Sequence, residues 1–327
     1  MRERFADRLL EAPIAPSFSR LGLRVRARME NWRSLGTYDL SGRTVAITGA
    51  SSGLGWAAAH RLADLGARLI VIGRNDQRTN ECASSLANPN GVTHTALTAD
   101  LSEPADVHRL ADTLRTDHSD LDTLIHNAGA LLNHRATNSA GIEVTVAAQV
   151  LAPFALTGLL LDTLRGNRPA RVLTMSSGGM YTAGLTVNRL QMSSENYRGS
   201  EQYARAKRAQ VTLNEQWAAL VPASEVVFHS LHPGWADTPG VQDSLPRFHR
   251  YLKPALRSPA EGVDTLVWLV ADDHALDDTG VFWHDRHPRP LHRLPRTRRS
   301  DTPKRRAELW DWCRDQTGID PPPSTGS

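Results

Sequence analysis

The sequence predicts a single domain of the α/β class, a doubly wound parallel β-sheet covered by helices on both faces, with an extension at each end of the chain. Two observations lead to this prediction. From about residue 43, short runs rich in Val, Ile and Leu alternate with longer segments of helical periodicity. Directly after the first run comes TGASSGLG, residues 48–55, where a strand must turn into a helix. The chain has 327 residues and 40% hydrophobic content, enough for one large core.

The strands are expected at residues 43–48, 68–73, 93–99, 122–126, 171–175, 225–231 and 279–283. The helices between them are expected over 53–66, 75–87, 104–117, 139–164 and 201–221. The apolar run 150–161 is too short to cross a bilayer, so we expect it to be buried. The domain should span residues 41–285, between a basic extension at 1–40 and a second one at 286–327 that contains a short helix, KRRAELWDWCRDQ.

Both extensions are basic, although the formal net charge is only +3. Residues 1–36 contain eight Arg against four acidic residues, and DRHPRPLHRLPRTRRSDTPKRR follows the last expected strand. The simplest interpretation is a pair of solvated, partly flexible flanks. The alternative is peripheral contact with anionic lipid headgroups, because FSRLGLRVRARMENW mixes Arg with Leu, Phe and Trp. Nucleic acid is not expected as a partner, since the basic run holds no reading motif.

Cysteine usage and the N-terminus favour a cytoplasmic location. Cys82 and Cys313 are the only cysteines, so neither a disulfide framework nor a Cys-based zinc site is predicted. The first residues lack the apolar segment of a signal peptide. His284, His287 and His292 are separated by prolines that prevent a regular element from presenting them together, so no metal site is expected.

Short motifs follow three further strands. They are HNAG at 126–129, MSSGG at 175–179 and HPGWADTPG at 232–240. In a doubly wound sheet the carboxyl ends of the strands converge on one crevice, so these loops and the glycine-rich turn should face the same ligand. Glycines in that turn let the backbone approach a pyrophosphate placed over the helix N-terminus, where free N–H groups and the helix dipole favour an anion.

This ordered set of motifs, together with YARAK at 203–207, resembles the short-chain dehydrogenase/reductase family over roughly residues 41–285. More narrowly, SSGGM, HPGWADTPGV and FWHDRHP resemble the subgroup called dehydrogenase/reductase member twelve. The resemblance implies a Rossmann-type fold and an NAD(P)-dependent oxidoreductase that interconverts a carbonyl and an alcohol. Homodimers or homotetramers built on helices 139–164 and 201–221 would suit the family, but the extensions could instead block them.

Tyr203 and Lys207 are the expected centre of the chemistry. Residues four apart on a helix share a face, so the phenol and the ammonium should point into one cleft. The ammonium should lower the pKa of the phenol toward neutrality, and the resemblance implies that it also holds the cofactor ribose. By resemblance, Ser177 hydrogen-bonds the substrate oxygen. Gln149 stands where the family usually has Asn, which moves the amide outward by one methylene and puts the proton relay through Lys207 in question.

Cofactor choice depends on the end of the second strand. Arg74 stands there, and a guanidinium matches a 2′-phosphate, so NADP is favoured. Asp76, two residues on, keeps NAD as the less favoured alternative. The other residues expected to bind cofactor share a position in a motif at a strand end: Gly49, Ser51, Ser52, Gly53, Leu54, Gly55, Asp100, Leu101, Asn127, Ala128, Gly129, Pro233, Gly234, Ala236 and Thr238, with Tyr203 and Lys207 themselves.

Two questions stay open. Residues 180–200 look like an inserted loop similar to that of retinol-type dehydrogenases, in which Met180, Tyr181, Leu185 and Met192 line an apolar substrate pocket or simply pack. The alternative to an oxidoreductase on an apolar substrate is a cofactor-binding sensor or scaffold with weak or no catalysis, motivated by Gln149 and the basic flanks. A sugar-nucleotide epimerase is disfavoured, because those enzymes space their glycines differently.

Overall fold

A computed structural model describes residues 17–244 and 246–320, and within them eight strands form one sheet in the order β3-β2-β1-β4-β5-β6-β7-β8. The strands are β1 (Thr44–Thr48), β2 (Arg68–Gly73), β3 (Thr95–Thr98), β4 (Thr123–His126), β5 (Ala170–Met175), β6 (Val226–Leu231), β7 (Val281–His284) and β8 (His287–Pro288). The first seven are parallel, and the order reverses beside β1, as expected for a doubly wound sheet.

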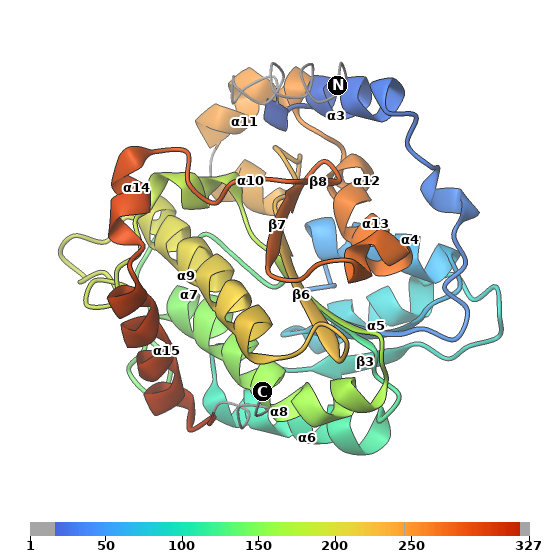
Figure 1. The fold of residues 1–327 in the computed structure, drawn as a ribbon, viewed down its shortest axis with the longest axis horizontal. Helices are drawn as coiled ribbons and strands as arrows, with labels where there is room; N and C mark the ends of the chain where they lie inside the picture. The colour runs from blue at the N-terminus through green and yellow to red at the C-terminus, as the bar shows by residue number, and fades with distance from the viewer. Residues whose placement is uncertain (1–16, 245, 321–327) are drawn as a thin grey trace.

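Helices cover both faces of the sheet (Figure 1). One face carries α4 (Gly53–Asp64), α5 (Asp76–Ser85) and α13 (Asp264–Ala271), and its core gathers residues such as Leu62, Cys82 and Leu266. The other face carries α6 (Pro104–Asp117), α8 (Ala152–Gly166) and α9 (Gly199–Leu220), with Leu114, Phe154 and Trp217 in its core. Strands buried on both faces explain the nearly continuous apolar runs of the sequence.

The expected core elements are present, with ends that differ by a few residues. The helix expected from 139 begins at Val144 as α7 (Val144–Val146) and continues through a π-helical turn, η2 (Ala147–Leu151), into α8. The joined helix is long and apolar enough to cross a membrane, unlike the shorter run judged from sequence, but 72% of its most apolar window is buried within the protein. The burial expected for it is therefore observed.

Sequence patterns missed several elements. β8 pairs antiparallel with β7, so the sheet has an eighth strand inside the presumed C-terminal extension. The helices not anticipated are α10 (Pro239–Ser244), α11 (Pro246–Leu252), α12 (Pro259–Gly262), α13 and α14 (Pro295–Ser300). Most of them are short or lie in the loops after the sixth strand, where propensity is a weak guide.

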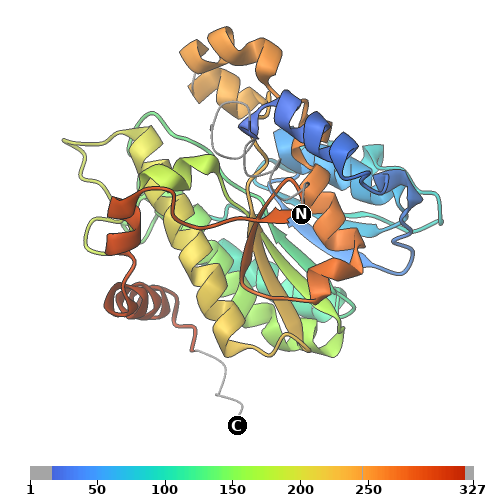
Figure 2. The ribbon, with the colours of Figure 1, turned by 45° about the horizontal axis from the view of Figure 1, so that its top comes forward.

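The extensions are packed against the domain rather than solvated, within the described residues. On the N-terminal side, α3 (Arg20–Met29) buries Leu23 and Arg26. On the C-terminal side, α15 (Pro303–Thr317) buries Leu309, Trp310 and Cys313 along α8 and α9 (Figure 2). The expectation of flexible flanks is wrong for these segments, because their apolar side chains complete the core. Residues 1–16 lie outside the described part of the chain.

Candidate active site

The glycine-rich turn between β1 and α4 has the shape of an anion cradle. Gly49 has φ +68°, and a Cβ atom there would come within 2.7 Å of Ala128 Cα. A Cβ on Gly55 would meet the carbonyl oxygen of Gly49 at 2.1 Å, so no side chain fits. Ser52 is the N-cap of α4 but its side chain caps nothing, and the first N–H groups of a helix have no partner within it. These donors suit a dinucleotide phosphate.

The neighbouring motif locks this turn in place. Asn127 Nδ2 donates to the carbonyl oxygens of Thr48 at 2.9 Å and Gly49 at 3.2 Å, and the N–H groups of Asn127 and Ala128 both donate to Thr48 Oγ1 at 3.0 Å. The amide nitrogen of Asn127 is therefore used to join β4 to β1. Its predicted contact with the cofactor can come only through its remaining atoms.

Ser177, Tyr203 and Lys207 lie together at the carboxyl end of β5. The Ser177 side chain hydrogen-bonds the phenol of Tyr203. Lys207 Nζ is 5.4 Å from the centre of the Tyr203 ring and donates to the carbonyl oxygen of Met175, the last residue of β5, at 2.9 Å. The helical spacing on α9 thus brings phenol and ammonium to one place, as predicted, and the serine loop joins them there.

The electrostatics of the pair differ from the expectation. Burial raises the pKa of Tyr203 to about 12, and the hydrogen bond from Ser177 opposes this only in part. Burial also lowers the pKa of Lys207, which is 2% exposed, to about 7. The expected lowering of the phenol pKa by the ammonium is not seen in this structure, where desolvation is the largest influence on the pKa of Tyr203 and the Ser177 hydrogen bond acts against it. Tyr203 is protonated at neutral pH.

Gln149 lies beside this cluster, in the π-helical turn η2. Its Nε2 donates to the carbonyl oxygen of Ala130 at 2.9 Å, and its Oε1 has no hydrogen-bond partner among the described residues although Gln149 is 1% exposed. A Cβ atom on Gly129 would lie 3.1 Å from both Gln149 Oε1 and Lys207 Nζ, so the amide oxygen and the ammonium approach the same point. The longer amide is thus accommodated next to Lys207.

The far end of the crevice holds the residues expected to select the cofactor. Arg74 follows β2, is exposed and, among the described residues, forms no hydrogen bond or ion pair. Asp76 Oδ1 accepts a hydrogen bond from Thr98 Oγ1 at 2.8 Å. Asp100 accepts from the N–H and hydroxyl of Ser102 at 2.9 and 2.7 Å, which shapes the turn after β3, and Leu101 is buried beside it.

The loop after β6 closes over the start of α4. A Cβ atom on Gly53 would lie 3.6 Å from Thr238 Cβ, and one on Gly262 would meet Leu54 Cδ2 at 2.8 Å and Ala236 Cβ at 3.1 Å. Pro233 and Gly234 lie against Arg257, a residue that sequence reasoning missed. No motif marks Arg257, and only its complete burial within the fold reveals it.

Two other groups of residues singled out in the sequence, the apolar residues of 180–200 and three histidines, lie outside the cluster of Ser177, Tyr203 and Lys207. Met180, Tyr181, Leu185 and Met192 are all buried at 5% exposure or less, so they pack and do not line an open pocket. The three histidines turn to separate partners: His284 to the carbonyl oxygen of His232, His287 to Glu30 and His292 to Asp301. Nowhere in residues 17–244 and 246–320 do three His, Cys, Asp or Glu side chains gather as a metal site.

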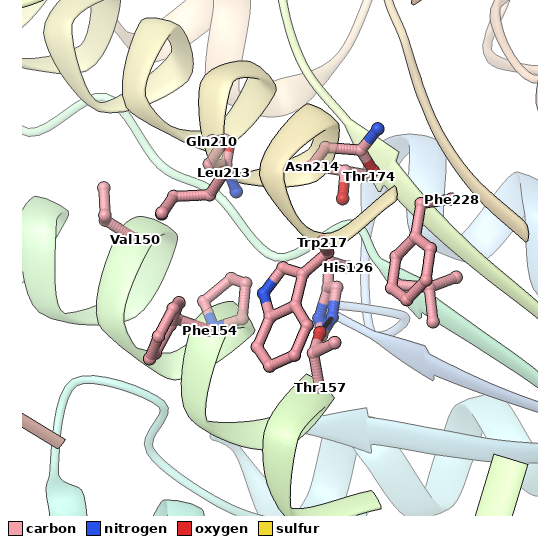
Figure 3. A pocket seen from close by; sticks show the side chains of 12 residues that line it. His126, Val150, Phe154, Thr157, Thr174, Gln210, Leu213, Asn214, Trp217 and Phe228 are labelled. Carbon is pink, nitrogen blue, oxygen red and sulfur yellow. Dashed lines mark hydrogen bonds between the residues drawn. The ribbon is translucent and has the colours of Figure 1, made fainter. Parts of the chain in front are cut away.

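A small cavity of about 20 Å³ is lined by residues of α8, α9, β5 and β6 (Figure 3), and Ser177 and Tyr203 are not among its lining residues. Four of the lining residues, His126, Gln210, Asn214 and Trp217, each have a buried polar atom without a partner among the described residues. Its size suits a single water molecule rather than a substrate.

The family model for short chain dehydrogenase matches residues 43–247. The chain belongs to the short-chain dehydrogenase family. It is 36% identical over 273 residues to dehydrogenase/reductase SDR family member 12 of Bos taurus, covering 83% of this chain and 85% of that protein. It is 30% identical over 298 residues to retinol dehydrogenase 14 of Mus musculus, covering 86% and 87%.

Solved structures agree in fold. The L-sorbose reductase of Gluconobacter frateurii, complexed with NADPH and L-sorbose, superposes with a TM-score of 0.62 at 22% identity and covers 75% of this chain and 95% of that one. As a member of the family, the chain is an NAD(P)-dependent oxidoreductase acting on CH–OH and C=O groups. The residues of the cradle fit the phosphates of such a dinucleotide.

Proposed function

We propose that this chain is an NADPH-dependent reductase of apolar carbonyl compounds, with Tyr203 as the proton donor. The observation that carries the proposal is the cluster at the end of β5, in which Ser177 hydrogen-bonds a phenol whose pKa is raised by burial to about 12. A protonated phenol can donate to the oxygen of a carbonyl as negative charge develops there. The nicotinamide supplies the hydride when bound.

Each neighbour has a distinct role in this proposal. The Ser177 hydroxyl shares the substrate oxygen with Tyr203 and orients it. The Lys207 ammonium, with a pKa near neutrality, holds the ribose and replaces the proton that Tyr203 gives up. The Gln149 amide oxygen lies where it can accept a hydrogen bond from Lys207 directly or through a water, which would keep a relay open despite the added methylene.

An apolar substrate and NADPH are both supported by surrounding residues. The apolar side chain of Leu131 lies near Gly199 at the start of α9, one turn before Tyr203, where a Cβ atom on that glycine would be 3.3 Å from Leu131 Cδ2. Arg74 is free to pair with a 2′-phosphate, whereas Asp76 is engaged by Thr98. NAD is the less favoured cofactor for this reason.

Turnover of a carbonyl panel with NADPH, followed at the absorbance of the reduced nicotinamide, tests the proposal. The wild-type protein should oxidise NADPH, and Tyr203→Phe should lose about a hundredfold or more in kcat while it still binds NADPH. Binding without turnover on any carbonyl would instead support the second candidate, a cofactor-binding sensor or scaffold. Undiminished turnover by Tyr203→Phe would contradict the assignment of the proton donor.

Peripheral membrane contact is a further part of the proposal. On α3, Leu21 and Met29 are 63% and 41% exposed and lie beside the exposed Arg24 and Arg28. This outer face joins apolar and cationic groups, as an interfacial helix does. A Leu21→Glu, Met29→Glu variant should no longer sediment with anionic vesicles. Sedimentation equal to that of the wild-type protein would contradict membrane contact through α3. We also propose a cytoplasmic location, because the two cysteines are free thiols.

A further inference from the structure

The N-terminal segment reaches the active site through Phe18. We propose that Phe18 is a positioning residue that fixes the loop carrying Ser177 against the loop after β6, so that the segment around residues 17–29 is a working part of the site. The inference rests on the proposed function, because it assigns the purpose of a contact within that site. It concerns a region outside the residues 43–247 that match the family.

Phe18 lies between the two loops. A Cβ atom on Gly178, the residue after Ser177, would come within 2.8 Å of Phe18 Cε2, so the ring edge contacts the serine loop directly. On the other side, the N–H of Trp235 donates to the carbonyl oxygen of Phe18 at 2.8 Å, and the two rings pack edge to face with centroids 5.9 Å apart. The residue itself is 3% exposed.

A buried ion cluster holds Phe18 there. Asp285 is fully buried between two arginines, at 2.5 Å from Arg26 Nη1 and 2.6 Å from Arg257 Nη1. Arg257 also donates to the carbonyl oxygens of Ser17 at 3.1 Å and Ser19 at 3.2 Å, the residues on either side of Phe18. Moving the Phe18 segment away would break these contacts and leave buried charges with fewer partners, which is strongly destabilising.

Arg257 of the same cluster also contacts the loop after β6, which is proposed to bind the cofactor. Arg257 Nη1 donates to the carbonyl oxygen of Pro233 at 3.1 Å, and its guanidinium occupies the space that a side chain on Gly234 would need. Arg257 therefore holds both sides: its guanidinium bonds Pro233 and the two neighbours of Phe18, and its backbone N–H donates to the carbonyl oxygen of Trp235 at 2.7 Å. A shift of Phe18 moves the serine loop and the proposed cofactor loop relative to each other, and small misplacements of reacting groups are costly in rate.

The test compares Phe18→Ala and Phe18→Leu with Trp310→Ala. Trp310 is a matched control, because it is also a buried aromatic of an extension but packs on Phe154 and Trp217, away from the site. The readouts are Kd for NADPH by fluorescence, kcat and KM for the reactive dicarbonyl isatin, and Tm. Phe18→Ala should weaken NADPH binding by about fivefold and lower kcat by about tenfold or more, with partial recovery in Phe18→Leu. Trp310→Ala should lower Tm and leave NADPH binding unchanged.

A double substitution tests the contact itself. Gly178→Ala should impair the protein because its new methyl group overlaps the ring, and adding Phe18→Leu should restore part of both NADPH affinity and kcat. Unchanged Kd and kcat in Phe18→Ala, or additive losses in the double variant, would overturn the inference. If wild-type protein does not reduce isatin, the proposed function is in question, but the NADPH affinities still decide the role of Phe18.

Discussion

The side-chain oxygen of Gln149 and the ammonium of Lys207 meet beside Gly129, each 3.1 Å from the position that a Cβ atom on that glycine would occupy. The family resemblance implies a shorter amide at this position, and the longer amide of Gln149 lies here in a π-helical turn, Ala147–Leu151. Turns of this kind are frequent at functional sites. Gln149 is buried, its Oε1 has no partner in the part of the chain that the structure describes, and it is placed to interact with Lys207.

Two substitutions at Gln149 should distinguish the effect of its amide group from the effect of its side-chain length. Gln149→Leu removes the acceptor and should lower kcat by about tenfold, since a relay partner is lost, while NADPH affinity stays the same. Gln149→Asn restores the family's amide and should keep kcat within about threefold of wild type. The two kcat values are compared at fixed pH. Equal activity of the Leu variant and wild type would exclude a role for the amide.

The depressed pKa of Lys207 predicts a pH dependence of stability. Burial lowers this pKa from 10.5 to about 7, so between these values the unfolded chain binds a proton that the folded chain releases. The free energy of unfolding should therefore rise as pH increases from about 7 toward 10. Urea unfolding without cofactor at pH 7 and pH 9 measures it, and Lys207→Met should show a smaller rise. A rise of the same size in that variant would show that Lys207 is not its source.

Tyr203 should make the free energy of unfolding fall with pH, in a higher pH range than the one in which Lys207 makes it rise. Its pKa is raised from 10.0 to about 12, so the unfolded chain loses the phenol proton first. The stability contributed by the protonated, buried phenol is present below pH 10 and is lost as pH rises through 12. Tyr203→Phe should reduce this loss in unfolding experiments above pH 10. An unchanged alkaline loss would mean that the phenol is not buried in solution.

Arg74 should decide the choice between the two nicotinamide cofactors. Arg74→Ala should weaken NADPH binding by about tenfold or more, because one charge-assisted contact to the 2′-phosphate is worth about 1.5–3 kcal/mol. NADH binding should not change. Arg115→Ala, a substitution at an exposed arginine on α6, serves as the control. Equal losses for NADPH and NADH would place the 2′-phosphate elsewhere.

The C-terminal helix α15 covers faces of α8 and α9 that were expected to form an interface between subunits. We therefore expect the protein to be a monomer. Trp310 packs on Phe154 of α8 and Trp217 of α9 at 4.9 Å between ring centroids, and Ile319 lies against Gly158. These are the helices on which the family resemblance implied a dimer or a tetramer, unless the extensions blocked it. Sedimentation equilibrium should give the mass of one chain, 36.0 kDa. A dimer whose contacts protect α8 and α9 from hydrogen exchange would contradict this assignment.

Local chemistry explains what the sequence could predict. Alternating apolar runs and the glycine turn determine the sheet, and the Tyr203 to Lys207 spacing places both groups on one helix face. The pKa of Tyr203 could not be predicted, because burial depends on the whole fold. Arg26, Arg257 and Asp285 join segments more than 200 residues apart in the chain, so no local pattern indicates their cluster. The role of Phe18 could not be predicted from the sequence for the same reason.

A crystal structure of the NADPH complex tests the central claim most directly. It should show the pyrophosphate over the first turn of α4, the Lys207 ammonium in contact with the nicotinamide ribose, and the Tyr203 hydroxyl facing the nicotinamide beside Ser177. A dinucleotide bound away from the glycine turn, or a nicotinamide out of reach of the Tyr203 hydroxyl, would contradict the assignment of this cluster as the catalytic site.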